Sequence, residues 1–332
     1  MRILVTGGAG FIGSNFIRLL IAQNENYKIV NLDKLTYAGN LDNLKDLENN
    51  KHYAFVKGDI CNSVLVDSLV KKCDYIVNFA AETHVDRSIL NAKNFIRTDV
   101  EGTFTLLEAA KKHRVKKYIQ ISTDEVYGSI EKGYFTEGSV LNPTNPYSAS
   151  KAGADMLAYS YYKTFKVPVL IIRSSNNFGP YQHPEKFIPL FITNSLEDKK
   201  LPLYGDGMNK RDWLYVLDNC EAIKCVMQKG VEGEIYNVGA ANEMTNIYIA
   251  KFILKELNKP ELLIEFVADR LGHDQRYALD CKKINKLGWK LKYKFQDALR
   301  ETIKWYVNNK KWWQKIKSST FKDYYKKQYG NL

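Results

Sequence analysis

Apolar runs alternate with helical patterns through the first half of the chain. Each run has the length of a buried strand, and between the runs apolar residues recur at intervals of three or four. Helices are expected from Ser14 onward and at about 92–113 and 146–165. The alternation predicts an α/β fold in which helices cover both faces of a doubly wound parallel sheet. The expected strands are residues 2–6, 28–32, 52–57, 74–79, 117–121 and 167–173.

The pattern changes after Arg173. Residues 174–203 are rich in Asn, Pro and aromatic residues, which predicts loops that shape a substrate site at the carboxyl edge of the sheet. Returning strands are expected at 212–216 and 235–238, with a helix at 217–229 between them. The predicted division is a first domain of 1–180 with returning segments at about 211–238, and a smaller, discontinuous second domain of about 181–210 and 239–332.

A glycine-rich turn, Gly7-Gly8-Ala9-Gly10-Phe11-Ile12-Gly13, follows the first strand directly. The glycines let the backbone approach a phosphate closely, and the following helix N-terminus supplies amide donors. Asp33 ends the second strand, where a carboxylate accepts the ribose hydroxyls of NAD and repels the extra phosphate of NADP. Lys34 weakens that preference slightly. A glycine turn without a ligand is the alternative, but the order strand, turn, helix, strand and acid favours a Rossmann-type site for NAD.

A second group of candidate residues lies further along the chain. Thr123, Asp124 and Glu125 follow the fifth strand, so their side chains are expected at the carboxyl end of the sheet. Tyr147 and Lys151 lie four residues apart on a later helix and share one face of it. The pKa of a free phenol is about 10, and a neighbouring ammonium favours the phenolate, which can take the proton of an alcohol. Because Tyr-x-x-x-Lys is common by chance, this interpretation depends on the cofactor site.

Composition agrees with an intracellular enzyme. A chain of 332 residues with 45% hydrophobic content can bury a full core. No apolar run is long enough to cross a membrane, and Met1 leads directly into the first strand, so neither a membrane partner nor a secretory leader is expected. The five cysteines form no close pair, which predicts free thiols in a reducing cytoplasm. The five histidines lack metal-ligand spacing, so no metal is expected.

The net charge of +12 is concentrated at the end of the chain. Residues 304–332 contain eight lysines and one acid, Asp323, and so carry seven of the twelve net charges. Lysines interleaved with aromatic residues can bind nucleic acid by stacking on bases. We expect instead that the aromatic side chains dock the last helix while the lysines stay solvated, and that no nucleic acid is bound. These aromatic residues are Trp305, Trp312, Trp313, Tyr324 and Tyr325.

Several phrases resemble known families. Residues 6–13, 122–127 and 147–151 resemble the extended short-chain dehydrogenase/reductases, which act on nucleotide sugars. Within that superfamily, the likeness to the dTDP-glucose 4,6-dehydratases covers essentially the whole chain. Thr123-Asp124-Glu125 is the specific signal, because epimerases of the same fold usually carry small or hydroxyl residues there. The phrases that resemble the dehydratases are 33–40, 80–88, 122–128, 173–189 and 269–274.

The resemblance implies a reaction. It implies oxidation of dTDP-glucose at C4, loss of water across C5 and C6, and return of the hydride to C6 from a retained NAD. In this implied reaction, Glu125 is the base at C5 and Asp124 is the protonated acid at the C6 hydroxyl. Tyr147, supported by Lys151, takes the C4 hydroxyl proton, while Thr123 hydrogen-bonds the same oxygen. The product is dTDP-4-keto-6-deoxyglucose, for deoxysugar biosynthesis of the dTDP-rhamnose type. The alternative for Asp124 and Glu125 is a surface turn or a helix cap.

The glycine turn and the resemblance together give two sets of expected binding residues. Arg211 and Arg270 suit a diphosphate because a guanidinium matches phosphate oxygens, although a surface ion pair is the alternative for an isolated arginine. The expected NAD contacts are Gly7, Gly10, Phe11, Ile12, Gly13, Asp33, Lys34, Thr36, Asp59, Ile60, Phe79, Ala80, Ala81, Thr98, Tyr147, Lys151 and Asn177. The expected substrate contacts are Thr83, Thr123, Asn176, Lys186, Phe187, Ile188, Pro202, Tyr204, Arg211, Asn246, Asp269, Arg270 and His273.

Departures and alternatives remain. Leu271 stands where many relatives have proline and Asp99 where many have asparagine, and we expect effects on loop stiffness and local contacts but not on the reaction. The resemblance implies a homodimer through the helices at 92–113 and 146–165, although both helices could simply pack on the sheet. Other readings are a different nucleotide-sugar dehydratase, a 4-epimerase, or a catalytically silent protein that senses NAD or binds nucleic acid. Thymidine over uridine rests on the resemblance alone.

Overall fold

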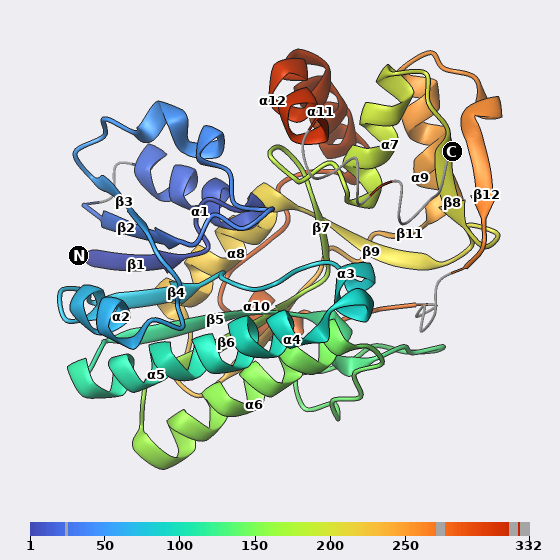
Figure 1. The fold of residues 1–332 in the computed structure, drawn as a ribbon. Coiled ribbons are helices and arrows are strands. Elements are labelled where there is room, and N and C mark those ends of the chain that lie inside the picture. The colour runs from blue at the N-terminus through green and yellow to red at the C-terminus, as the bar shows by residue number, and fades with distance from the viewer. Residues whose placement is uncertain (24–25, 270–275, 319–324, 326–332) are drawn as a thin grey trace.

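The computed structural model describes residues 1–23, 26–269, 276–318 and 325. At its centre lies a seven-stranded sheet with the order β10-β6-β5-β4-β1-β2-β3, in which all neighbouring strands are parallel (Figure 1). The chain order reverses between β1 and β4, the place where sheets of this kind bind ligands. The sheet confirms the predicted fold class. Its strands are β1 (Arg2–Thr6), β2 (Lys28–Asp33), β3 (Tyr53–Lys57), β4 (Tyr75–Asn78), β5 (Lys117–Thr123), β6 (Val169–Ser174) and β10 (Ile235–Val238).

Helices cover both faces of this sheet, as expected. Helices α1 (Phe11–Ala22) and α8 (Val216–Lys229) pack together on one face, and α2 (Ser63–Val70), α5 (Gly102–His113) and α6 (Pro146–Phe165) cover the other (Figure 1). Ile3 and Val5 belong to one buried cluster and Leu4 to the other, because successive side chains of a strand point to opposite faces. Burial on both faces explains why the strands read as continuous apolar runs.

The helix expected at 92–113 is present but contains a π-helical turn. After α3 (Val85–Leu90), the chain forms α4 (Ala92–Phe95), a π-helical turn η2 (Ile96–Glu101) and then α5. A Cβ on Gly102 would lie 2.3 Å from Cδ1 of Ile60, so the helix packs closely here against the loop after β3. The π-helical turn adds one residue to the helix without breaking it, so the apolar periodicity of the sequence could not predict it.

The second half of the chain departs further from expectation. The segment predicted as loops contains a buried helix, α7 (Phe187–Leu196), because an apolar run there is hidden among Asn, Pro and aromatic residues. Strand β9 (Lys210–Tyr215) does not return to the main sheet but lies between β7 (Asn176–Phe178) and β11 (Glu243–Thr245). The remaining elements are η1 (Leu41–Leu47), η3 (Asp124–Tyr127), β8 (Leu201–Tyr204), which pairs with β12 (Ile264–Val267), α9 (Asn246–Glu256), η4 (Glu261–Leu263), α10 (Lys282–Lys286), α11 (Phe295–Asn308) and α12 (Lys310–Lys317).

The last helices dock on the body through aromatic side chains. Trp313 is fully buried, and Nε1 of Trp312 donates to Oδ1 of Asn43 at 2.9 Å. Trp305 packs edge to face on Trp312. The expectation that all the lysines stay solvated is wrong for Lys317, because its ammonium is buried and lies 2.7 Å from a carboxylate oxygen of Glu197.

The division into two domains stays a prediction.

Among the described residues, no helix combines the length and the apolar character needed to span a bilayer.

Candidate active site

Thr123, Asp124 and Glu125, the polar residues predicted from the sequence, lie at the carboxyl end of β5. Thr123 is the last residue of the strand, and its Oγ1 accepts the amide of Glu125 at 3.3 Å, which caps the short helix η3. Asp124 is 1% exposed, with Oδ1 receiving the Thr123 hydroxyl at 3.3 Å. Its Oδ2 is buried without a hydrogen-bond partner among the described residues. A surface turn therefore does not describe this segment.

The surroundings of Asp124 favour its protonated form. Burial raises the pKa of this carboxyl group well above its usual range, and the charges of Glu125 and Asp212 raise it further. Asp212 is itself held in place, because its two oxygens accept the amides of Ala240 and Asn242. A buried carboxylic acid in this state can donate a proton.

Helix α6 brings Tyr147 and Lys151 to the same edge of the sheet. Asn145 caps the helix by accepting the amide of Ser148 at 3.0 Å. One turn later, Nζ of Lys151 donates to the carbonyl oxygen of Ile121 on β5 at 2.7 Å. Tyr147 lines two neighbouring clefts. Its pKa is raised well above 10 by burial and by the charges of Glu125 and Asp99, so the surroundings oppose the expected phenolate.

The first cleft follows the glycine turn along the carboxyl edge of the sheet. Gly7 has φ +67°, and a Cβ there would lie 2.6 Å from the amide nitrogen of Ala80, so only glycine leaves the cleft open. Asp33 accepts the amides of Ala9 and Leu35 at 2.9 and 2.8 Å and so fixes the turn. Asn43 supports it from behind by donating to the carbonyl oxygen of Ala9 at 2.9 Å.

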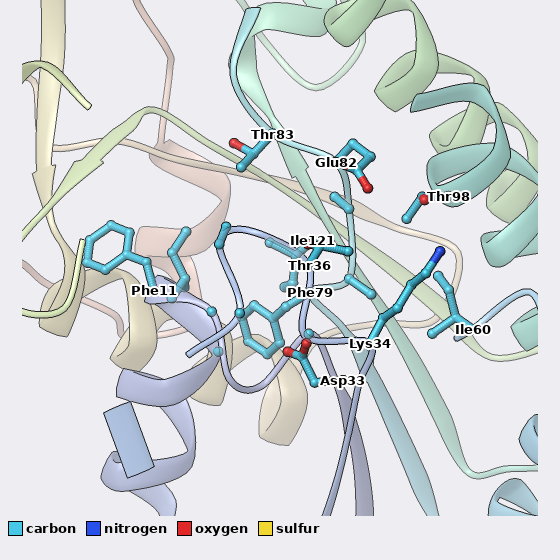
Figure 2. A pocket seen from close by; sticks show the side chains of 18 of the residues that line it. Phe11, Asp33, Lys34, Thr36, Ile60, Phe79, Glu82, Thr83, Thr98 and Ile121 are labelled. Carbon is cyan, nitrogen blue, oxygen red and sulfur yellow. The ribbon is translucent and has the colours of Figure 1, made fainter. Parts of the chain in front are cut away.

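Almost all the expected NAD contacts are gathered here. Figure 2 shows Lys34, Ile60 and Thr98 on one side of the cleft and Phe11 on the other, with Phe79 and Asp33 between them. Asn177 is the exception, because it lines the second cleft. The expected residues that line the first cleft are Gly7, Gly10, Phe11, Ile12, Gly13, Asp33, Lys34, Thr36, Asp59, Ile60, Phe79, Ala80, Ala81, Thr98, Tyr147 and Lys151.

The charge of Lys34 is compensated inside the cleft. Its ammonium lies 2.8 Å from a carboxylate oxygen of Asp59. Although burial alone would raise the pKa of Asp59, the hydrogen bonds from Lys34 and from the Cys61 amide lower it. The lysine that weakened the preference for NAD is thus already paired with a carboxylate.

The second cleft adjoins the first at Tyr147 and Thr83. Nζ of Lys186 donates to the Thr83 hydroxyl at 3.0 Å where the clefts meet. Arg211 is 6% exposed, and its guanidinium lies 4.8 Å from the ring centre of Tyr277. Of the expected substrate contacts, this cleft is lined by Thr83, Asn176, Lys186, Phe187, Ile188, Pro202, Tyr204, Arg211 and Asn246.

Two of the described residues that were expected to contact the substrate do not line the second cleft. Thr123 lies at the end of β5 and is not among its lining residues. Asp269 is exposed and lies beside Gly205. Arg270 and His273 fall outside the described residues, as does Leu271.

Sequence reasoning missed an ion pair at the second cleft, between a buried carboxylate and a partly exposed guanidinium. Glu185 is buried and accepts Nε of Arg87 at 2.9 Å, while the Arg87 guanidinium lies 3.7 Å from the ring centre of Tyr37. His183 and Glu82, also missed, line the first cleft. Arg87 and Glu185 lie in phrases that resemble the dehydratases, 80–88 and 173–189, but their pairing could not be inferred because they are 98 positions apart in the sequence.

Comparison with known proteins identifies the family. The sequence profile of the GDP-mannose 4,6 dehydratase family matches residues 4–302, so the chain belongs to this family. It is 52% identical to the low-salt glycan biosynthesis protein Agl12 of Haloferax volcanii, over 93% of this chain and 99% of that protein. It is 48% identical to a dTDP-glucose 4,6-dehydratase of Streptomyces niveus, over 96% of both chains.

A solved structure gives the same picture of the fold. DesIV, a dTDP-glucose 4,6-dehydratase from Streptomyces venezuelae solved with NAD and TYD bound, superimposes with a TM-score of 0.94 at 47% identity. The match covers 95% of this chain and all of that chain. The likeness therefore extends over nearly the whole chain.

Proposed function

We propose that the protein is an NAD-dependent dTDP-glucose 4,6-dehydratase, a hydro-lyase of deoxysugar biosynthesis. The observation that carries the proposal is the pair Asp124 and Glu125 at the end of β5, beside Tyr147 at the meeting point of two clefts. Oxidation alone requires one base, whereas elimination of water requires a further base and an acid. The relatives named dTDP-glucose 4,6-dehydratase support the nucleotide and the sugar.

The first cleft fits a dinucleotide. The turn at Gly7 has no room for a Cβ, and together with the amides at the start of α1 it suits a pyrophosphate. Asp33 lines the same cleft and suits a ribose. Asp33, together with the pairing of Lys34 to Asp59, supports NAD over NADP. The chemistry that NAD supplies when bound is acceptance and return of one hydride, beside a positive ring that favours the Tyr147 phenolate.

The side chains of the site divide the remaining chemistry. Tyr147 takes the proton of the C4 hydroxyl, and Thr123 hydrogen-bonds the same oxygen. The ketone at C4 acidifies the C5 proton, which Glu125 removes, while Asp124 protonates the C6 hydroxyl so that it leaves as water. Glu125 then returns a proton to C5. Lys151 holds the end of α6 that carries Tyr147 against β5, and it places a positive charge near Tyr147.

The second cleft suits the nucleotide sugar. Arg211 and Lys186 supply positive charge, and the aromatic and apolar residues Phe187, Ile188 and Pro202 offer a surface for a base. We propose that further substrate contacts come from Thr83, Asn176, Tyr204, Asn246, Asp269, Arg270 and His273.

The test is incubation of the purified protein with dTDP-glucose in deuterated water without added NAD, followed by mass spectrometry and proton NMR. A 4-keto-6-deoxy sugar with deuterium at C5 is the expected product and establishes both elimination and a retained cofactor. Turnover of UDP- or GDP-glucose alone would contradict the nucleotide assignment. An epimerised sugar without loss of water would contradict the roles of Asp124 and Glu125.

We further propose a cytoplasmic homodimer that forms through α5 and α6. The two helices lie side by side on one face of the sheet (Figure 1). Their outer sides and the adjoining π-helical turn expose Ile96, Phe104 and Met156 to 51%, 46% and 55%. Exposed apolar side chains at helical spacing support burial by a second copy.

All five cysteines are free thiols, which supports the cytoplasmic, reducing compartment proposed here.

A further inference from the structure

Asp99 is a buried carboxyl group that the reaction as described does not use. It is 2% exposed and projects from the π-helical turn η2, a kind of helical defect that often occurs at functional sites. We expected this residue to affect only local contacts. The structure instead places it beside the residues proposed to carry out the oxidation at C4.

Its two oxygens join the cofactor cleft to the tyrosine helix. Oδ1 accepts the amide of Glu82, in the segment after β4 that lines the first cleft, at 3.0 Å. Oδ2 accepts the hydroxyl of Ser150 at 2.6 Å. The Ser150 hydroxyl also lies 2.8 Å from the carbonyl oxygen of Tyr147, so Asp99 is attached to the turn of α6 that carries Tyr147 and Lys151.

The charged groups around this point come from three elements. Lys151 on α6 acts on Asp99 as a favourable charge, and Glu82 acts on it as an unfavourable one. Tyr147 on α6 is influenced by Asp99 and also by Glu125 and Asp124 on η3. Asp99 is thus the carboxyl group that acts on Tyr147 from η2, whereas the two elimination carboxyl groups act on it from η3.

We propose that Asp99 is a positioning residue, which fixes the segment after β4 against α6 and whose carboxyl charge controls the acid–base state of Tyr147. The proposal rests on the proposed function, because it concerns the proton taken from the C4 hydroxyl. A neutral side chain of the same shape would keep the Glu82 contact, and its amide could donate to the Ser150 hydroxyl, but it would remove the charge.

The direction of the effect follows from the charges. Burial raises the pKa of Asp99 to about 6, although Lys151 and the Ser150 hydrogen bond oppose this. Above that pH its negative charge adds to those that raise the pKa of Tyr147. Removing the charge should therefore let Tyr147 lose its proton at a lower pH, by about one pH unit.

The kinetic test compares the pH profiles of kcat/KM for dTDP-glucose in wild type, Asp99→Asn, Ser150→Ala and Glu101→Gln. The acid limb of Asp99→Asn should lie about one unit lower, giving up to about tenfold higher kcat/KM on that limb. A deuterium isotope effect with substrate deuterated at C4 shows whether the profile reports the oxidation step. Glu101→Gln removes an exposed carboxyl group from the same turn and should leave the profile unchanged. Ser150→Ala loses the hydrogen bond to Asp99 but keeps the charge, so a purely hydrogen-bonding role would change the profile of Ser150→Ala and leave Asp99→Asn like wild type.

A second readout requires no substrate. The raised pKa means that the folded protein binds a proton at Asp99 that the unfolded chain has released, so ionisation destabilises the fold as pH rises from about 4 to about 6. The melting temperature of Asp99→Asn should therefore exceed that of wild type above pH 6 and approach it near pH 4. An unshifted acid limb in a folded, NAD-containing Asp99→Asn, or equal melting curves at both pH values, would overturn the proposal. Absence of turnover in wild type would instead refute the proposed function while leaving the melting test valid.

Discussion

Asp124 and Glu125 are neighbours in the sequence, yet the fold gives their carboxyl groups different surroundings. Asp124 is enclosed at the end of β5 with a raised pKa, whereas Glu125 lines the second cleft. Two carboxyl groups of the same kind can thereby take the roles of acid and base. The sequence located both groups but could not tell which of them is enclosed, because that depends on β9 and on Asp212 within it.

Glu125→Gln tests the division of labour. The amide cannot remove the C5 proton, so overall turnover should fall by about 10²- to 10⁴-fold while oxidation at C4 continues. NADH absorbance after addition of dTDP-glucose reports the oxidation, and deuterium at C5 reports proton removal. Glu131→Gln, which changes an exposed loop carboxyl group, is the control. Unimpaired turnover would remove Glu125 from the mechanism.

Tyr147→Phe tests the first step. Loss of the phenol should lower the rate of C4 oxidation by about 10²- to 10⁴-fold, with little change in stability because the ring keeps its contact with Phe95. Rapid-mixing measurements of NADH formation give that rate. Tyr161→Phe removes a hydroxyl from the same helix outside both clefts and should retain activity. A modest effect of Tyr147→Phe would require another base for the C4 hydroxyl.

At the scale of elements, the local signals located most of the structure. The predicted bounds of β1, α6 and β10 agree with the structure to the residue, because each is a strong apolar run or a capped helix. Helix α1 begins at Phe11, three residues before the expected Ser14, since the glycine turn continues directly into the helix. The destination of β9 was not predictable, because a short apolar run does not specify which strands it will pair with.

Gly7 shows how one element depends on a backbone conformation. Gly7→Ala combines φ +67° with a Cβ 2.6 Å from the backbone of Ala80, so the turn must move. We expect a loss of about 1 to 3 kcal/mol in stability and a marked loss of NAD from the purified protein. Gly133→Ala has φ +81° but meets no atom within 4 Å, so it carries the backbone strain alone. Equal NAD content in the two variants, measured by absorbance after denaturation, would show that the close approach at Ala80 is not needed.

At the scale of the whole molecule, the substrate site is assembled from distant parts of the sequence. Thr83, Lys186 and Arg211 belong to different segments and meet only because α7 and β9 cross the carboxyl edge of the main sheet. Sequence reasoning could name these residues through resemblance, but composition and periodicity alone gave no sign of their proximity. The Arg87–Glu185 pair escaped for the same reason.

The exposed face of α5 and α6 provides a test of assembly. Phe104→Glu combined with Met156→Glu places charges on the proposed contact, so sedimentation should show a monomer where wild type sediments as a dimer. Leu262→Glu changes another exposed apolar residue, on η4, and should leave the dimer intact. A monomeric wild type, or a double variant that remains dimeric, would place the interface elsewhere.

Asn43 ties the beginning of the chain to its end. Its amide holds the carbonyl oxygen of Ala9 in the glycine turn, while its Oδ1 accepts the indole N–H of Trp312 on α12. A ribosome adds about 5 to 20 residues per second, so Trp312 follows Asn43 by roughly 13 to 54 seconds. In a nascent chain without α12, Asp33 can already hold the amide of Ala9, while Asn43 still lacks its indole donor. The last helix therefore completes the support behind the nucleotide turn only when synthesis is nearly finished.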